Sequence, residues 1–342
     1  MNNSRTALLG LALSVPLALT LLSSASAQSY SFTDFDASGS GLFTTVNGIS
    51  NSGSVVGTLL NDDGTNTNFS GMPEAFTALN LPGSASANAI NSTGQVVGSD
   101  GSDAFLLNGA ATAPTEQLLT RVNDTTLSEV AFGINESGTI VGQYVDTGSA
   151  ASALGFVDTQ GRYTTLNPKG NSLSTSANGI NNNGLVVGFY APAGSTGQTS
   201  GFLFDTLTSQ YSTIMDPAVS DLVGTQFLGI NDSGEAVGYY VTNANPATVS
   251  VQHGFLYNTT TQVYTFLDDP NVAPDGSEIM QITGITNSGE IAGFYTNADG
   301  AQLGFIATPA AVPEASSIVS LGVLLALGLG GVYAAKKRKI AA

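Results

Sequence analysis

Residues 48–57 read Gly-Ile-Ser-Asn-Ser-Gly-Ser-Val-Val-Gly, and this stretch decides the fold because the chain repeats it. Every copy has an Ile, polar residues, a Gly that we call the turn glycine, an apolar pair, and a final Gly that we call the strand glycine. The copies occupy residues 48–57, 89–98, 133–142, 179–188, 229–238 and 284–293. Their isoleucines are 41, 44, 46, 50 and 55 residues apart. A fixed pattern at such intervals indicates one structural unit per copy.

Each copy has the chemistry of a β-hairpin. Asn, Asp and Ser favour turns through local side-chain hydrogen bonds. The turn glycine supplies the positive φ that a short hairpin loop needs. The Val and Ile residues that follow it favour a strand. The strand glycine leaves space for a bulge or a closely packed neighbour.

Each unit carries two further landmarks. One is a Phe, usually after Gly or Ala, at positions Phe69, Phe105, Phe156, Phe202, Phe255 and Phe305. The other is an aromatic strand, at residues 76–79, 163–166, 211–214 and 264–267, which the second unit lacks near residues 115–119. We therefore predict about four short strands per unit, with no helical periodicity in the body.

Four strands in a unit of this length match a propeller blade. The last unit lacks its aromatic strand, but residues 30–34, Tyr-Ser-Phe-Thr-Asp, resemble residues 264–268, Tyr-Thr-Phe-Leu-Asp. The N-terminal strand is thus expected to complete the last unit and cover its open edge. We predict an all-β fold in which residues 28–308 form a six-bladed β-propeller. The alternative is an open array or β-solenoid of the same units, which needs no shared strand.

The repeats resemble the HAF family of extracellular repeats. The resemblance rests on the repeated hairpin and on His253-Gly254-Phe255-Leu256-Tyr257 in the fifth unit. The other units have no His at that position. The family implies export and repetition, and no particular activity.

The N-terminal end has the pattern of a secretory signal peptide. Arg5 precedes an apolar run, and small residues follow it up to Ala27. We expect residues 1–27 to be removed after Ala27, and the alternative is a retained membrane anchor.

The C-terminal end has a linker in residues 309–317, an 18-residue apolar run in residues 318–335 and a basic end in residues 336–342. The apolar run is close to the lower limit for a membrane helix, and the basic end favours the cytoplasmic side. This order closely resembles the PEP-CTERM sorting signal of Gram-negative bacteria, with Val312, Pro313 and Glu314 as its motif. The resemblance implies recognition and cleavage by an exosortase-type enzyme. It also implies a membrane-anchored precursor and then a place at the cell surface or in the extracellular matrix. A plain anchor is the alternative.

The exported body is strongly acidic. Residues 28–312 hold 24 acidic residues against Arg121, Arg162 and Lys169, a net charge of −21. Such a surface repels nucleic acid and anionic lipid, so we expect neither as a partner. The chain has no Cys, which excludes disulfides, a thiolate nucleophile and Cys-based metal sites.

No catalytic constellation is recognisable, and we predict no enzymatic activity. His253 is the only His, which is too few for the usual zinc set, and no nucleophile elbow surrounds it. The pairs Asp62-Asp63 and Asp268-Asp269 lie in turn-like sequence. The spatial separation that a glycosidase needs cannot be read from the sequence. We expect no cofactor. Residues 61–64 and 268–271 offer oxygen ligands for Ca²⁺, although neither follows the EF-hand pattern.

Aromatic residues follow the strand glycine in several units, as Phe189-Tyr190, Tyr239-Tyr240 and Phe294-Tyr295. Strand alternation turns one ring of each pair inward and the other toward a groove. We predict Tyr190, Tyr240 and Tyr295 as the rings that stack on glycan. The expected function is a non-enzymatic surface or matrix module that binds extracellular polysaccharide. The alternatives are a glycan-active glycosidase or lyase, and a structural protein without a ligand.

Overall fold

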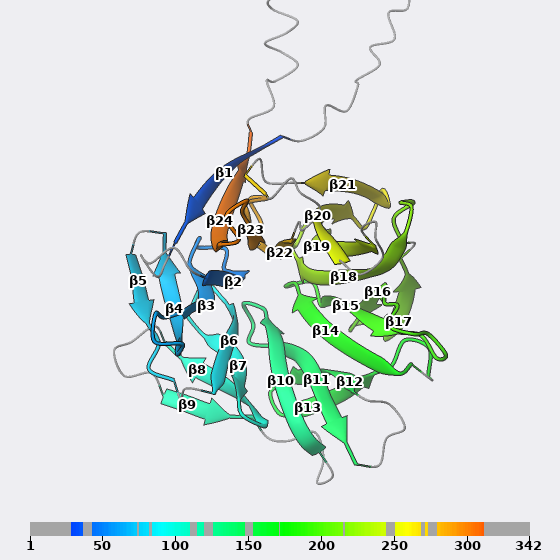
Figure 1. The fold of residues 1–342 in the computed structure, drawn as a ribbon. Coiled ribbons are helices and arrows are strands. Elements are labelled where there is room, and N and C mark those ends of the chain that lie inside the picture. Colours follow the sequence, from blue (N-terminus) through cyan, green and yellow to red (C-terminus); the bar gives the residue numbers. More distant parts are fainter. Residues whose placement is uncertain are drawn as a thin grey trace, which may run out of the picture.

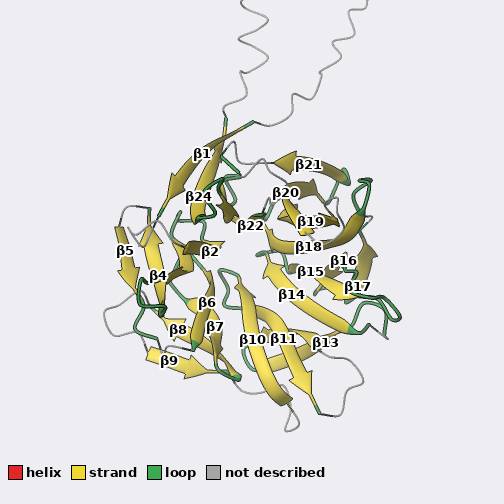
Figure 2. Ribbon diagram, in the orientation of Figure 1, coloured by secondary structure: helices red, strands yellow, loops and turns green. Residues whose placement is uncertain are grey.

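The structure is a computed structural model. It describes residues 29–36, 43–73, 75–81, 84–109, 115–119, 126–147, 153–170, 172–214, 216–243, 250–267, 271–272 and 279–310. The predicted signal peptide, the motif Val312-Pro313-Glu314 and the predicted membrane span lie outside these residues. The described residues contain strands and loops (Figure 2) and no helix with the length and hydropathy of a membrane span.

The described residues form six groups of four antiparallel strands, which stand around a central axis as the blades of a propeller (Figure 1). Four of the blades are separate sheets, and blades one and six join into one sheet of eight strands. Blade one contains β2 (Phe43–Ile49), β3 (Val55–Leu60), β4 (Asn66–Met72) and β5 (Ala75–Ala78). Blade two contains β6 (Ala85–Ile90), β7 (Val96–Asp100), β8 (Asp103–Asn108) and β9 (Thr115–Leu118). Blade three contains β10 (Thr126–Ile134), β11 (Ile140–Asp146), β12 (Leu154–Thr159) and β13 (Arg162–Leu166).

The second half of the chain repeats this order. Blade four contains β14 (Ser174–Ile180), β15 (Leu185–Ala191), β16 (Ser200–Asp205) and β17 (Gln210–Thr213). Blade five contains β18 (Leu222–Ile230), β19 (Glu235–Asn243), β20 (Ser250–Asn258) and β21 (Val263–Leu267). Blade six contains β22 (Met280–Ile285), β23 (Ile291–Thr296) and β24 (Gln302–Pro309), with β1 (Tyr30–Phe35) as its outer strand. A single parallel pair, Phe43 with Gln302, links blades one and six.

The predicted closure is confirmed. β1 pairs with β24 along its whole length, from Tyr30 opposite Pro309 to Phe35 opposite Gly304. The backbone N–H of Ala310 also donates to the carbonyl of Ser29 at 2.7 Å. The sixth blade is therefore completed by the first strand of the chain, which excludes the open array.

The predicted alignment of β1 is wrong by two residues. In blade five Tyr264 pairs with Tyr257, two residues after the landmark Phe255. In blade six the equivalent partner of Ala307 is Phe32, not Tyr30. Phe32 packs on Phe305 with ring centroids 5.3 Å apart, as Tyr264 packs on Phe255 at 5.1 Å. A shift of two residues keeps the same face of the strand inward, so the closure survives it.

The repeated motif forms the two inner strands of each blade. Every turn glycine has a φ between 78° and 83°, as predicted. Every strand glycine lies opposite the landmark Phe of the next strand, for example Gly188 opposite Phe202. A Cβ at Gly188 would overlap the Ser176 carbonyl oxygen and lie 3.0 Å from the Phe202 ring. The glycine thus makes room for the ring that fills the blade core.

Candidate functional site

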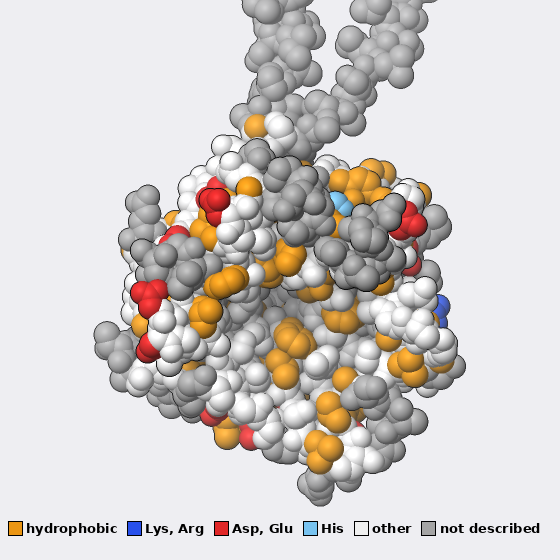
Figure 3. Space-filling view, viewed as in Figure 1, with side chains coloured by type: hydrophobic (Ala, Val, Ile, Leu, Met, Phe, Trp, Pro, Cys, Tyr) orange, Lys and Arg blue, Asp and Glu red, His pale blue; other side chains and the backbone are white. Residues whose placement is uncertain are grey.

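A cavity lies on the propeller axis, at the end of the channel remote from the hairpin turns. It encloses about 350 Å³. All six inner strands contribute to it with the residue that precedes the Gly-Ile or Ala-Ile pair of the motif. These residues are Asn47, Asn88, Phe132, Asn178, Leu228 and Thr283. The face shown in Figure 3 is hollowed at its centre, with hydrophobic side chains around the hollow.

Blades four, five and six build one wall of this cavity from cross-strand pairs. In each of them a polar side chain on the inner strand lies beside an aromatic ring on the second strand. The pairs are Ser176 with Phe189, Gln226 with Tyr239, and Gln281 with Phe294. Blade three adds Gln143. The amide and aromatic groups face the same space because directly opposed residues of an antiparallel pair lie on one face of the sheet.

Hydrogen bonds hold part of this wall in place and leave part of it available. The hydroxyl of Tyr239 donates to Oε1 of Gln226 at 2.8 Å, and burial raises the pKa of Tyr239 to about 12. Nε2 of Gln281 donates to Oε1 of Gln252 at 2.6 Å. Among the described residues, neither Nε2 of Gln226 nor the side-chain amide of Gln143 has a hydrogen-bond partner. These amide groups are in place to meet a ligand's hydroxyl groups.

The opposite side of the cavity, formed by blades one and two, has no aromatic ring at the equivalent positions. Blades one and two carry Thr58 and Ser99 after their strand glycines, where blades four to six carry rings. Neither residue lines the cavity, and neither do Thr45 and Ser86, their cross-strand partners. This cavity, which we call the mouth, is therefore asymmetric. It has an aromatic wall on the side of blades four to six and small polar side chains beyond its edge on the side of blades one and two.

The lining is electrically neutral. Of the described residues around the cavity, Tyr239 alone has an ionisable side chain. The chemistry on offer is hydrogen bonding by amides and hydroxyls, and contact with aromatic faces. This combination suits a ligand with hydroxyl groups on an apolar ring, as in a sugar.

The channel narrows beyond the mouth. A second space of about 80 Å³ lies between the Gly-Ile segments, and a third of about 70 Å³ lies at the turn end. Neighbouring inner strands are in close contact here, since a Cβ added at Gly179 would lie 2.9 Å from Cα of Gly229. Amide side chains bridge the blades, and Asn181 Nδ2 donates to the carbonyl of Asn231 at 2.9 Å.

A chain of hydrogen bonds surrounds the turn end, which is the end of the axial channel where the hairpin turns of the repeated motif lie. The backbone N–H of Glu136 donates to Asn182, that of Asn182 to Asp232, and that of Asp232 to Asn287. The N–H of Asn287 donates to Asn51, whose Nδ2 donates to Glu136 and closes a circle of five residues, which we call the hairpin circle. Each link joins a blade to another one, so the circle ties the blades together at the axis.

The two carboxylates of this circle are engaged by protein donors. Glu136 accepts hydrogen bonds from the backbone N–H and the hydroxyl of Ser92. Burial alone would raise the pKa of Asp232, but hydrogen bonds from Asn182 and Asn287 outweigh it and hold that pKa below its usual value. Asp232 therefore stays ionised at neutral pH and is unsuited to act as a general acid.

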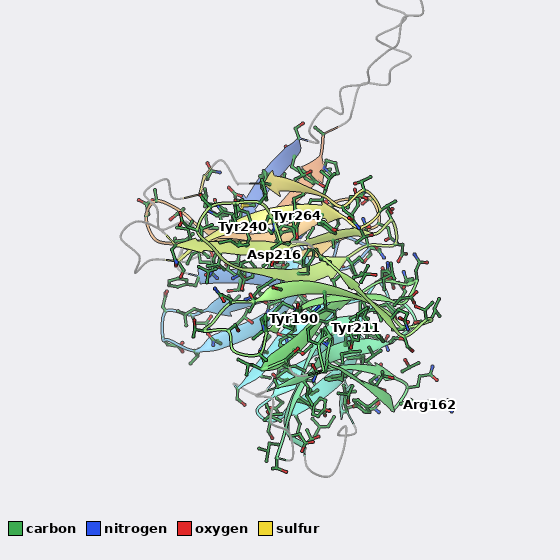
Figure 4. The ribbon with its side chains drawn as sticks, turned by 90° about the vertical axis from the view of Figure 1, so that its right-hand side faces the viewer. Arg162, Tyr190, Tyr211, Asp216, Tyr240 and Tyr264 are labelled. Carbon is green, nitrogen blue, oxygen red and sulfur yellow. The ribbon has the colours of Figure 1, made fainter. Side chains whose placement is uncertain are left out.

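None of the three rings predicted to stack on glycan lines this cavity. Tyr190, Tyr240 and Tyr295 are 8%, 9% and 1% exposed and belong to the hydrophobic clusters of the blades. Figure 4 shows Tyr190 and Tyr240 among the sheets of the ring. The alternation itself was predicted correctly, but its phase was reversed. The first ring of each pair, in Phe189, Tyr239 and Phe294, lines the cavity instead.

The remaining candidates stay apart from the cavity. The ring of His253 stacks on Tyr240 at 4.9 Å, on the blade side of that strand. Asp63 accepts hydrogen bonds from its neighbour Thr65, which lower its pKa, while Asp268 and Asp269 lie outside the described residues. No group of three or more His, Cys, Asp or Glu side chains that could hold a metal ion occurs in the described part of the chain.

Residues 173–336 match the model of a family described as a protein of unknown function (DUF3466). The match begins directly before β14 and includes blades four and five and the strands β22 to β24 of blade six, which together carry the aromatic wall. No curated protein matches the chain. This segment of the chain is therefore similar to the DUF3466 family, and the description of that family names no activity.

Several solved structures are similar in fold. An oligogalacturonate lyase from Vibrio parahaemolyticus has 11% identity and a TM-score of 0.47, over 84% of this chain and 99% of that one. The β-propeller domain of the Trilobed protease from Pyrococcus furiosus, described as having an open velcro topology, has 10% identity and a TM-score of 0.45. That match covers 77% of this chain and 78% of the other. TolB from Acinetobacter baumannii has 10% identity and a TM-score of 0.47, over 75% and 64%. These are likenesses of fold alone and carry no function over.

Proposed function

We propose that the protein is an exported, non-catalytic module that binds uncharged extracellular polysaccharide in the mouth of its propeller. One observation carries the proposal: three successive blades present amide or hydroxyl groups beside aromatic rings in a cavity without a charged side chain. Aromatic faces pack on the apolar faces of sugar rings, while amides pair with their hydroxyls. The acidic body adds selectivity because its charge repels polymers of uronic acids.

Export and surface sorting form part of the same proposal. They rest on the sequence of the two ends, with an exosortase-type enzyme as the partner that removes the PEP-CTERM-like tail and the HAF-type repeats as the exported body. The fold is compatible with this arrangement. β24 ends at Pro309 beside β1 on the outer half of blade six, so a tail that continues from there starts at the rim of the ring. Intact mass of the secreted protein tests it, and a product that retains residues 1–27 or 318–335 would contradict it.

Binding is tested with immobilised polysaccharides. The neutral set consists of dextran, mannan, galactan and β-1,3-glucan, and the charged set of alginate and polygalacturonate. We expect retention on a neutral polymer and none on the charged set. F189A should reduce that retention at least tenfold, whereas F266A, which removes a ring exposed on the outer strand of blade five, should leave it unchanged. Failure to bind any neutral polymer would refute the proposal.

The glycosidase or lyase alternative is less well supported. Hydrolysis with either stereochemical outcome needs two carboxyl groups at the scissile bond. The described residues that line the mouth include none, and at the turn end Glu136 accepts a hydrogen bond from Ser92 and Asp232 accepts one from Asn182. Incubation with the retained polymer, followed by measurement of new reducing ends, tests this part. Release of oligosaccharides would overturn the non-catalytic assignment.

A further inference from the structure

We infer that the mouth is a blind site that receives the end of a neutral saccharide chain, one or two sugar units deep, and that the chain leaves across blades one and two. The inference rests on the proposed function and specifies its ligand. It concerns which part of a polymer is bound.

The sizes of the three axial spaces set the depth. An engineered protein cavity of about 150 Å³ is large enough for benzene, a six-membered ring. The mouth, at about 350 Å³, is more than twice that size, but the two spaces below it hold about 80 and 70 Å³. A sugar ring therefore fits in the mouth and not beyond it, while the deeper spaces suit a few water molecules.

The packing around the axis prevents the channel from widening. The inner strands meet at their motif glycines, where Cα of Gly284 lies 3.1 Å from the position of a Cβ on Gly229. Amide bridges between blades reinforce this contact above and below it. Asn178 Nδ2 donates to the carbonyl of Phe227, and Asn135 Nδ2 to that of Asn181. A polysaccharide cannot thread through the ring without breaking these bonds, so only a chain end can enter.

The lopsided mouth gives the chain one way out. Phe189, Tyr239 and Phe294 raise the wall on blades four to six. The equivalent positions on blades one and two hold Thr58 and Ser99. By strand alternation Ser99 faces the channel, as Phe189 does. Among the described residues no ring stands at these two positions, so a chain whose end contacts the aromatic wall can continue over Ser99.

The first test asks whether the affinity depends on the concentration of polymer chain ends or on the mass concentration of the polymer. The full chain in mild detergent is titrated with the neutral polymer that it retains best, before and after partial hydrolysis to about one tenth of the length. We expect the apparent dissociation constant to be unchanged per mole of chain ends and to fall about tenfold per unit mass. Unchanged affinity per unit mass would overturn the inference while leaving the proposed function intact. Absence of binding to every neutral polymer would overturn both.

The second test blocks the exit. S99W should weaken binding of the polymer at least tenfold and change binding of the matching disaccharide less than twofold, while S99A should change neither. Equal loss of polymer and disaccharide in S99W, with an unaltered melting temperature, would contradict the exit path. If S99W melts early, the end-counting titration of the unmodified protein still decides the inference.

Discussion

Replacing Phe32 with Ala tests whether the N-terminal strand closes the ring. Phe32 is half-buried on β1, and its ring lies 5.3 Å from that of Phe305, which is fully buried. Removing a fully buried Phe side chain costs about 3–5 kcal/mol. Half of this is about 2 kcal/mol, and the tilted ring pair adds about 0.5–1.5 kcal/mol. F32A should therefore lower the free energy of unfolding by about 3 kcal/mol.

Urea denaturation followed by far-UV circular dichroism measures this loss, since the chain has no Trp to report on its core. At about 2 °C per kcal/mol, the melting temperature should also fall by roughly 6 °C. L207A is the control. It removes a side chain that is 83% exposed in the turn between β16 and β17, away from the closure, and should change the free energy of unfolding by less than about 0.5 kcal/mol. A loss in F32A no larger than in L207A would refute the closure.

Three further changes probe the blade core, the hairpin circle and the mouth. G188A should cost about 3 kcal/mol or more in urea denaturation, because the new Cβ overlaps the backbone carbonyl of Ser176; a loss below about 1 kcal/mol would contradict that packing. The pKa of Asp232 is lowered in the folded state, so its contribution to stability is present above its unfolded pKa and is lost as the pH falls through the folded value. D232N should remove this acid-dependent part of the unfolding curve, and an unaltered curve would exclude the role of Asp232 in the circle. Tyr239 has a pKa of about 12 when folded, so stability should decline between about pH 10 and 12 as the unfolded state ionises. Burial also raises the pKa of Tyr30, Tyr163 and Tyr264, so Y239F should reduce that decline without abolishing it, and a curve as steep as before would show that Tyr239 does not contribute.

The sequence holds part of the information that places the aromatic wall. The residue after each strand glycine lies opposite a channel-facing position of the inner strand, as Phe189 lies opposite Ser176. The choice between the two rings of a pair depends on the bulge that every inner strand makes just before the Gly-Ile segment, between Ala177 and Gly179 in blade four. A bulge changes the phase of alternation, and the sequence does not mark on which side of it the count must start.

The repeated motif by itself determined the unit, the hairpin, the turn glycines and the number of blades, because these follow from local chemistry at fixed spacing. It also indicated closure, since β1 carries the aromatic strand that the last unit lacks. Only the tertiary structure decided the register of β1, which places Phe32 rather than Tyr30 against the blade core, because two registers two residues apart share the same face. It alone assembled Gln143, Gln226 and the three rings into one mouth and linked the hairpins in a circle. Those contacts join residues of different blades, and their distances depend on how six blades pack around an axis, which no local pattern encodes.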